Sequence, residues 1–115
     1  MVTKTADINV HVCPKYHTAV ELIGRRWTGA ILSAMLMGAT RFTDIIHAVP
    51  GLSDRLLSER LKELENANIV DRIVHPETPV RIEYRLTAKG HELNEAISAL
   101  ASWAESWADD GTHIW

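Results

Sequence analysis

The sequence has little of several features that would fix its class at once. Its single cysteine, Cys13, excludes an intramolecular disulfide and leaves one thiol that can react or link two chains. No apolar run approaches the roughly 20 residues of a membrane-spanning helix, and the first residues do not resemble a signal peptide. We therefore expect a cytoplasmic protein that has no membrane partner.

The motifs of common enzyme classes are also missing. The sequence has no phosphate-binding glycine loop, no GxSxG turn and no HExxH helix. Cys13 has no evident partner for nucleophilic catalysis beyond His17. We therefore expect no enzymatic activity and no cofactor.

Size and charge leave a DNA-binding protein open. The chain has 115 residues, of which 46% are hydrophobic, and this suits one compact domain with a modest core. We expect residues 13–115 to form that domain and residues 1–12 to form an N-terminal arm. The net charge is −3, but residues 90–115 hold five carboxylates and no lysine or arginine. Because salt screens exposed charges more than about 10 Å apart, an acidic C-terminus does not exclude a DNA-binding surface elsewhere.

Three helices are predicted in the first half of the sequence. One opens at Pro14, which suits a first helical turn, and stops at Gly24. The second, within residues 26–38, is apolar nearly all round and belongs in the core. Thr43 is expected to cap a third, short helix, which Pro50–Gly51 ends.

A fourth helix follows Ser53, which is a ready N-cap. Leu57, Leu61 and Leu64 recur at i, i+4 and i+7, and they form one narrow apolar stripe. The opposite side of this helix carries Arg55, Ser58, Glu59 and Lys62. The third and fourth helices, with a tight turn between them, predict a helix-turn-helix.

Two extended segments and a last helix complete the predicted fold. The segments IVDRIVH and VRIEYRL, residues 69–75 and 80–86, are rich in β-branched residues and are joined by the turn PETP. A hairpin directly after a helix-turn-helix is a wing, so the predicted fold is mainly α with a β-hairpin. Thr87 is expected to cap a long final helix with apolar residues at coiled-coil-like spacing. The residues expected in a dimer interface are Ile97, Leu100, Trp103 and Trp107, with a ligand pocket as the less favoured use of the tryptophans.

The polar face of the fourth helix suits contact with double-stranded DNA. In a helix-turn-helix the second helix lies in the major groove, where its outer face and N-terminal end reach base edges. Arg55 can contact guanine, and Glu59 can accept a hydrogen bond from cytosine. The remaining candidates, for bases or phosphates, are Ser53, Ser58 and Lys62. The alternatives are a merely solvated face and a winged-helix adaptor that binds proteins without binding DNA.

The chain also resembles HxlR-type winged helix-turn-helix transcriptional regulators across residues 13–108. The resemblance lies in CPKYHTAVELIGRRWTGAILSAMLMGATRFTDI, PGLSDRLLSERLKELENANIVDR and PETPVRIEYRLTAKG. It implies a bacterial repressor or activator that forms a homodimer through N- and C-terminal helices and binds an inverted-repeat operator. Members often have proline and a basic or small residue after the cap, where this chain has Asp54, Arg55 and Leu56. The resemblance therefore does not give the operator sequence.

The wing carries a further candidate DNA contact. Arg81 follows the turn of the hairpin, and an arginine there can enter a narrow minor groove or bind a phosphate. The alternative is a solvated loop arginine. Three other arginines are candidates for backbone contact only: Arg41, Arg72 and Arg85.

Cys13 is the one residue with candidate covalent chemistry. It would occupy the N-cap of the first helix, where the helix dipole and nearby Lys15 favour the thiolate. In the resembled family, a cysteine just before this proline serves some members as a sensor of oxidants or electrophiles. The alternative is a packing residue in the dimer interface. His11, Cys13 and His17 lie close in sequence but lack the spacing of known zinc sites, so we expect no metal.

Overall fold

The structure is a computed structural model that describes residues 9–108. Its elements are α1 (Pro14–Ile23), α2 (Thr28–Leu36), α3 (Phe42–Ala48), α4 (Asp54–Asn66), β1 (Val70–His75), β2 (Arg81–Leu86), α5 (Ala88–His91) and α6 (Asn94–Trp107). The predicted fold, mainly helical with an antiparallel hairpin, is confirmed. Residues 1–8 of the expected arm and residues 109–115 of the expected domain lie outside the described residues.

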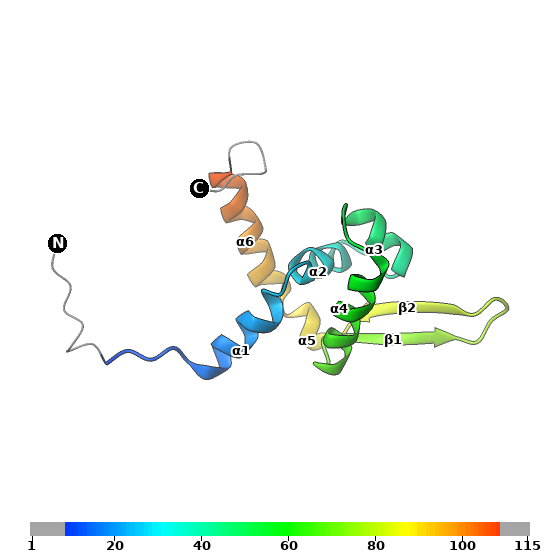
Figure 1. Cartoon of the computed structure of the whole chain (residues 1–115), viewed down its shortest axis with the longest axis horizontal. Coiled ribbons are helices and arrows are strands. Elements are labelled where there is room, and N and C mark those ends of the chain that lie inside the picture. The colour runs from blue at the N-terminus through cyan, green and yellow to red at the C-terminus, as the bar shows by residue number, and fades with distance from the viewer. Residues whose placement is uncertain (1–8, 109–115) are drawn as a thin grey trace.

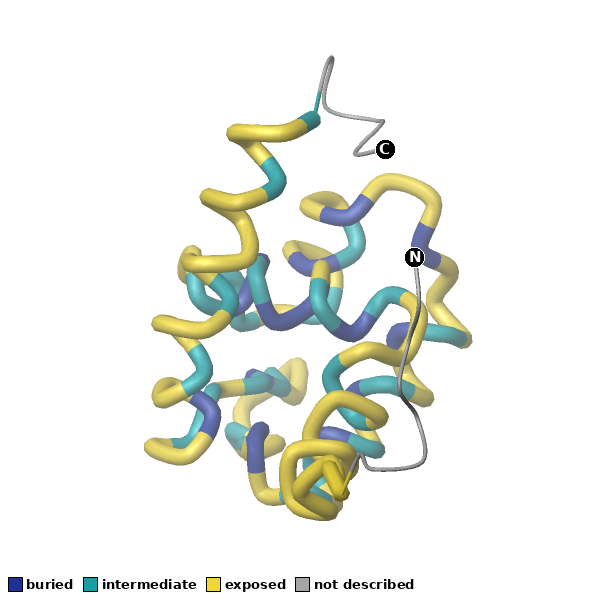
Figure 2. Tube along the Cα trace, turned by 90° about the vertical axis from the view of Figure 1, so that its left-hand side faces the viewer, coloured by how far each residue is buried: buried dark blue, intermediate teal, exposed yellow. Residues whose placement is uncertain are grey.

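The molecule has helices at one end and the β-hairpin at the other. Figure 1 shows α1 and α6 diverging at one end, while the hairpin of β1 and β2 projects from the other. The core lies between these ends, where α2, α3 and α4 meet the base of the hairpin (Figure 2). Its fully buried side chains include Ile31, Leu32, Ile45, Leu57, Leu61, Leu64 and Val70.

The helix-turn-helix consists of α3, a short turn and α4. Gly51 has a φ of 90° in this turn, a left-handed conformation that L side chains rarely adopt. The hydroxyl of Ser53 accepts a hydrogen bond from the amide of Leu56 at 3.1 Å, so the predicted N-cap is confirmed. Asp54 adds a negative charge to the first turn, where the helix dipole is positive.

The start of α3 differs from the prediction. The helix begins at Phe42, Arg41 is its N-cap, and no side chain caps it, so the prediction that Thr43 is the cap was wrong. The helix therefore starts two residues earlier than a cap at Thr43 would give, and its first residue, Phe42, packs against the core. Thr43 stays exposed in the first turn.

The hairpin pairs β1 with β2 in a regular antiparallel register from Val70↔Leu86 to His75↔Arg81. Residues directly opposite each other point to the same face, so the hairpin has two distinct faces. One face carries Val70, Arg72, Val74, Ile82, Tyr84 and Leu86, and the other carries Asp71, Ile73, His75, Arg81, Glu83 and Arg85. The amide of Tyr84 also donates to the carbonyl oxygen of Thr40 at 2.7 Å, which ties β2 to the segment before α3.

The C-terminal segment forms two helices where one was predicted. Thr87 caps only the short α5, because its hydroxyl accepts from the amide of Gly90 at 3.0 Å. The same hydroxyl donates to the carbonyl of Asn68 at 2.7 Å, and Gly90 lies so close to Ile69 that a Cβ would be 2.3 Å from its carbonyl oxygen. These contacts hold α5 against the base of the hairpin, and the long helix α6 starts separately at Asn94.

Candidate nucleic-acid interface

Helix α4 has the two faces that its sequence predicts. Leu57, Leu61 and Leu64 are buried, with exposed fractions of 0%, 2% and 0%. Because this stripe is packed into the core, the side of the helix on which each other residue lies is fixed. All five predicted contact residues on this helix and its cap are exposed: Ser53, Arg55, Ser58, Glu59 and Lys62.

The hairpin continues the surface of α4. Arg72 and Tyr84, from the face of the hairpin that carries Leu86, line a shallow hollow of about 210 Å³ together with Ser58 and Lys62. Arg72 is exposed, so it adds a positive charge beside the polar face of the helix. The exposed polar face of α4 therefore meets the hairpin at this hollow.

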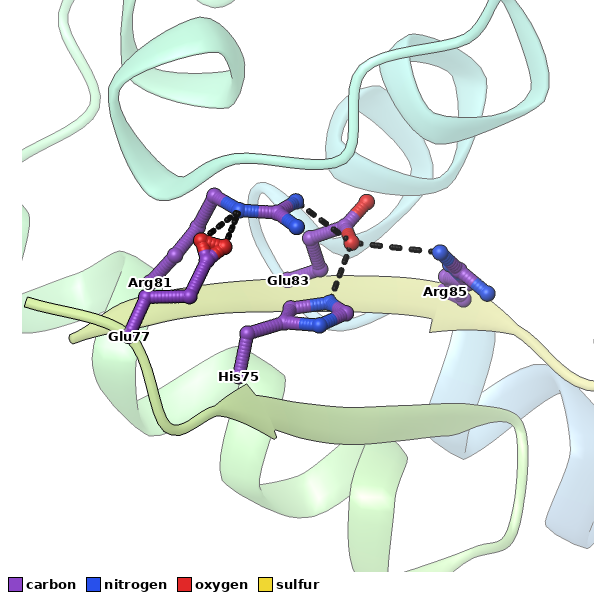
Figure 3. Close-up of polar contacts among 5 residues, drawn as sticks. All are labelled: His75, Glu77, Arg81, Glu83 and Arg85. Carbon is purple, nitrogen blue, oxygen red and sulfur yellow. Dashed lines mark hydrogen bonds and ion pairs between the residues drawn. The ribbon is translucent and has the colours of Figure 1, made fainter.

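The opposite face of the hairpin carries a cluster of charged side chains around Glu83 (Figure 3). Its Oε1 atom accepts from Nε2 of His75 at 2.5 Å, from Nη1 of Arg81 at 2.9 Å and from Nη2 of Arg85 at 3.1 Å. The Glu83 side chain is only 11% exposed. An ionised carboxylate accepts and cannot donate, so Nε2 of His75 carries the proton in this contact.

The electrostatics of this cluster favour the charged form of Glu83. Burial raises the pKa of the carboxyl group, but the hydrogen bond from His75 and the charges of Arg85 and Arg81 outweigh burial. The pKa of Glu83 therefore lies below its ordinary value. The carboxylate holds its three partners together as one unit at neutral pH.

Arg81 lies directly after the turn of the hairpin, within the second predicted strand. It is the first residue of β2, opposite His75, and its side chain is 33% exposed. Besides Glu83, its guanidinium contacts Glu77, with Nε 3.3 Å from Oε2. Arg81 is thus shared between two carboxylates, and its role in DNA contact stays a prediction.

Two polar residues were not singled out from the sequence, Glu83 and Arg60. Glu83 stands between Arg81 and Arg85 at a spacing of two, which places all three on one face of a strand and is a usable signal. Arg60 lies three residues after Leu57, so it borders the apolar stripe and not the exposed face. Its side chain is 11% exposed and reaches the segment between α1 and α2.

Cys13 occupies the predicted position at the start of α1. It is the N-cap of the helix, directly before Pro14, and it is exposed. Its carbonyl oxygen accepts from the amide of His17 at 3.0 Å, while its side chain makes no capping hydrogen bond. Within residues 9–108, the histidines, cysteine and carboxylates form no group of three that could hold a metal ion.

Helix α6, at the end of the molecule opposite the hairpin (Figure 1), has an exposed apolar surface. Leu100, Trp103 and Trp107 are 65%, 50% and 69% exposed, while Ile97 packs partly against the core. Figure 2 shows that α6 is exposed over most of its length. Beside Leu100 an apolar groove of about 420 Å³ runs between α1, α2 and α6. No helix in the described part of the chain is both long enough and apolar enough to cross a membrane.

Comparisons with known proteins agree with this geometry. The family model for the HxlR-like helix-turn-helix matches residues 22–112. Among curated proteins, the chain is 48% identical to YvaP of Bacillus subtilis (strain 168), described as an HTH-type transcriptional regulator, over 85% of this chain and 91% of that protein. It is 42% identical to the HTH-type transcriptional regulator YodB of the same organism, over 90% of this chain and 92% of YodB.

Solved structures give the same result. The reduced form of YodB aligns with a TM-score of 0.75 and 41% identity, covering 86% of this chain and 97% of that one. Diamide-treated YodB aligns with a TM-score of 0.71 and 42% identity, covering 85% of this chain and 97% of that one. Quinone-bound YodB aligns with a TM-score of 0.70 and 38% identity, covering 83% of this chain and 99% of that one. The redox regulator HypR in its reduced form aligns with a TM-score of 0.77 and 32% identity, over 83% of this chain and 94% of HypR.

Proposed function

Because this chain belongs to the HxlR-like helix-turn-helix family of transcriptional regulators, we propose that it binds an inverted-repeat operator in double-stranded DNA as a homodimer. In this proposal residues 13–115 form one domain with the arm 1–12 before it, and the protein acts in the bacterial cytoplasm. The matched proteins are regulators and not enzymes, so DNA binding is the activity to explain.

The observation that carries the proposal is the division of α4 into a buried leucine stripe and an exposed polar face. In the proposed complex α4 enters the major groove, Arg55 donates to guanine, and Glu59 accepts from cytosine. Lys62 and the two serines, Ser53 and Ser58, contact bases or phosphates. The hairpin lies beside the helix, where Arg81 reaches the minor groove or the backbone.

Dimerisation would follow from the apolar surface at the other end of the molecule. Leu100, Trp103 and Trp107 are exposed on α6, and Ile97 extends the same side toward the core. An apolar patch of this kind is seldom left open on a soluble monomer. Figure 1 shows the hairpin at the end of the chain opposite α1 and α6, so a second copy that covers those helices would leave the hairpin uncovered. Two-fold symmetry would then present two copies of α4 to one side of the DNA.

Binding to random duplex DNA at low and high salt separates this function from a protein-binding adaptor. A DNA binder releases counterions from the phosphates, so its affinity falls steeply as the salt concentration rises. We expect such a slope for the wild-type chain. An adaptor that never contacts DNA would show no binding at low salt and no slope.

We further propose that Cys13 makes DNA binding responsive to an oxidant or a small electrophile. The thiol is exposed at the N-cap of α1, directly before Pro14, so a small reagent can reach it. Structures of the relative YodB after diamide treatment and with quinone bound support a response of this kind. In the first case two Cys13 thiols, one from each copy, would lose two electrons and two protons to diamide and form a disulfide. With a quinone, the Cys13 thiolate sulfur would bond to a ring carbon while the ring C=C electron pair moves onto a carbonyl oxygen. Proton uptake from water at that oxygen, and loss of the ring proton, would leave a hydroquinone thioether.

The response is tested by comparing operator binding of wild type and Cys13→Ser. Each protein is measured untreated, after diamide or a quinone, and after diamide followed by reductant. A change in the wild type alone, reversed by reductant after diamide, is the expected result. If both proteins bind alike after treatment, Cys13 is a packing residue and the regulator receives its signal elsewhere.

A further inference from the structure

The junction between α1 and α2, residues 24–27, contacts the middle of α4 directly. Arg60 of α4 donates from Nε to the carbonyl oxygen of Arg26 at 3.0 Å. Its Nη1 atom lies 3.2 Å from Oε2 of Glu63, and the other oxygen of Glu63 lies 3.3 Å from Nε of Arg25. Arg60 therefore binds the junction directly, through the carbonyl of Arg26. It also binds the junction indirectly, through Glu63, which pairs with Arg25.

The same junction also touches the turn that precedes α4. Trp27 has a φ of 78°, which is uncommon for a residue other than glycine and persists only where the surroundings hold it. Its ring packs on the turn so closely that a Cβ added to Gly51 would lie 3.2 Å from Cη2 of Trp27. The guanidinium of Arg26 stands 5.0 Å from the centre of the Trp27 ring. The junction thus holds α4 at its middle and at the turn before it.

The contacts of Arg60 differ in strength from the surface ion pairs around them. The Arg25 side chain is 52% exposed, and an exposed ion pair contributes little to stability. The Arg60 side chain is only 11% exposed, so its hydrogen bonds are less open to competition from water than the Arg25 pair. The guanidinium of Arg60 is planar and donates to two acceptors, so these contacts also fix the orientation of its side chain. Arg60 therefore restricts rotation of α4 relative to α1 and α2, in addition to the packed leucine stripe.

We propose that Arg60 is a positioning residue that sets the separation and rotation of the two recognition helices in the dimer. The inference rests on the proposed function, in which α1 and α6 form the dimer interface. The junction connects α1, at that interface, to α4, and the contact between the junction and α4 is made by Arg60. Arg60 borders the buried stripe, so it acts through the placement of α4 and not through contact with DNA.

The test uses a set of operators whose half-sites are moved together or apart by one or two base pairs. Each added base pair rotates one half-site about the DNA axis by roughly a tenth of a turn, so a rigid dimer prefers one separation. We compare wild type with Arg60→Met, which keeps the apolar stem and removes both donors. Arg25→Met is the matched control, because it removes only an exposed ion pair of the same junction.

We expect Arg60→Met to lose roughly tenfold in affinity at the preferred separation, the order of one lost hydrogen bond, and to bind the other separations almost as well. Its salt dependence should equal that of the wild type, because no phosphate contact is lost. Arg25→Met should keep the wild-type profile. Glu63→Gln weakens the ion pair with Arg60, so it should partly reduce the preference for one half-site separation. This variant replaces Arg60→Met if Arg60→Met does not fold.

Four outcomes would overturn the inference. A sharp profile in Arg60→Met, or in Glu63→Gln where that variant stands in, shows that Arg60 does not set the separation. A uniform loss at all separations with a shallower salt slope shows that Arg60 contacts DNA directly. A wild-type chain that binds operators of every separation equally well has no fixed separation to set. A wild-type chain that binds no duplex at all contradicts the proposed function itself, and the inference falls with it.

Discussion

The Nε2 atom of His75 lies 2.5 Å from Oε1 of Glu83, a contact that joins the last residue of β1 to the middle of β2. The same oxygen accepts from Arg81 and Arg85. Three side chains of the hairpin are therefore oriented by one buried carboxylate. The charge of Glu83 determines whether the wing keeps this arrangement, and that charge depends on pH.

Stability should fall in acid because of Glu83. The pKa of this carboxyl group is lower in the folded chain than its ordinary value, so its contribution is present above the unfolded pKa and is lost as pH falls through the folded one. Urea unfolding at pH 7 and near pH 3 should show a smaller pH-dependent loss for Glu83→Gln than for wild type. Glu77→Gln, whose side chain is 50% exposed, is the control and should behave like wild type. Equal losses in all three proteins would mean that Glu83 does not carry the effect.

Base preference should depend on Arg55. If its guanidinium is bidentate to guanine, Arg55→Ala costs roughly 1 to 3 kcal/mol at that position and relaxes the choice of base there. Lys62→Ala provides the comparison, because loss of a phosphate contact weakens all sequences alike and lowers the salt slope. Binding is measured on an operator and on its single-base variants. A loss by Arg55→Ala that is equal for every sequence would exclude base readout by this residue.

Local sequence was sufficient to predict the parts of the fold that depend on neighbouring residues. The leucine stripe of α4 and its cap at Ser53 are set within one helix, and both were predicted correctly. The start of α3 and the separate α5 were missed because distant contacts decide them. Phe42 packs against the core, and Gly90 lies against the carbonyl of Ile69. No spacing rule in one helix or strand contains those neighbours.

The candidate site shows the same limit. Its exposed residues on α4 follow from helical periodicity, and all of them are exposed as predicted. The partners of Arg81 and Arg60 do not follow from it. Glu83 reaches His75 across the hairpin, and Arg60 reaches a carbonyl 34 positions earlier in the chain. Such pairs depend on strand register and helix packing, which the sequence pattern alone left undetermined.

Arg81 and Glu77 should affect DNA binding in opposite directions. Arg81→Ala removes a positive charge at the wing, so it should weaken binding and reduce any preference for A·T-rich flanks. Glu77→Gln removes the carboxylate that lies 3.3 Å from Nε of Arg81, so it frees the guanidinium and removes repulsion from phosphates. Titrations with A·T-rich and G·C-rich flanks measure both effects. If Arg81→Ala binds as wild type does, Arg81 is a solvated residue of the hairpin.

Dimerisation should depend on the apolar side of α6. Leu100→Asp combined with Trp107→Asp places two charges on a surface that a second copy would bury, and an unpaired buried charge is costly. Sedimentation should show monomers for this variant and dimers for wild type at micromolar concentration. Ser102→Asp, on the opposite side of the same helix, is the control and should stay dimeric. A dimer that persists in the double variant would show that another surface holds the copies together.

Selection of bound sequences from a random duplex pool tests the account most directly. A two-fold dimer presents two copies of α4 to one face of the DNA, so its two half-sites must lie one helical turn apart or a multiple of it. We expect the selected sequences to converge on an inverted repeat whose half-site centres are about 10 base pairs apart, or a multiple of that distance. Convergence on a single asymmetric half-site bound by a monomer, or no convergence at all, would contradict the proposal that this chain reads DNA as a homodimer.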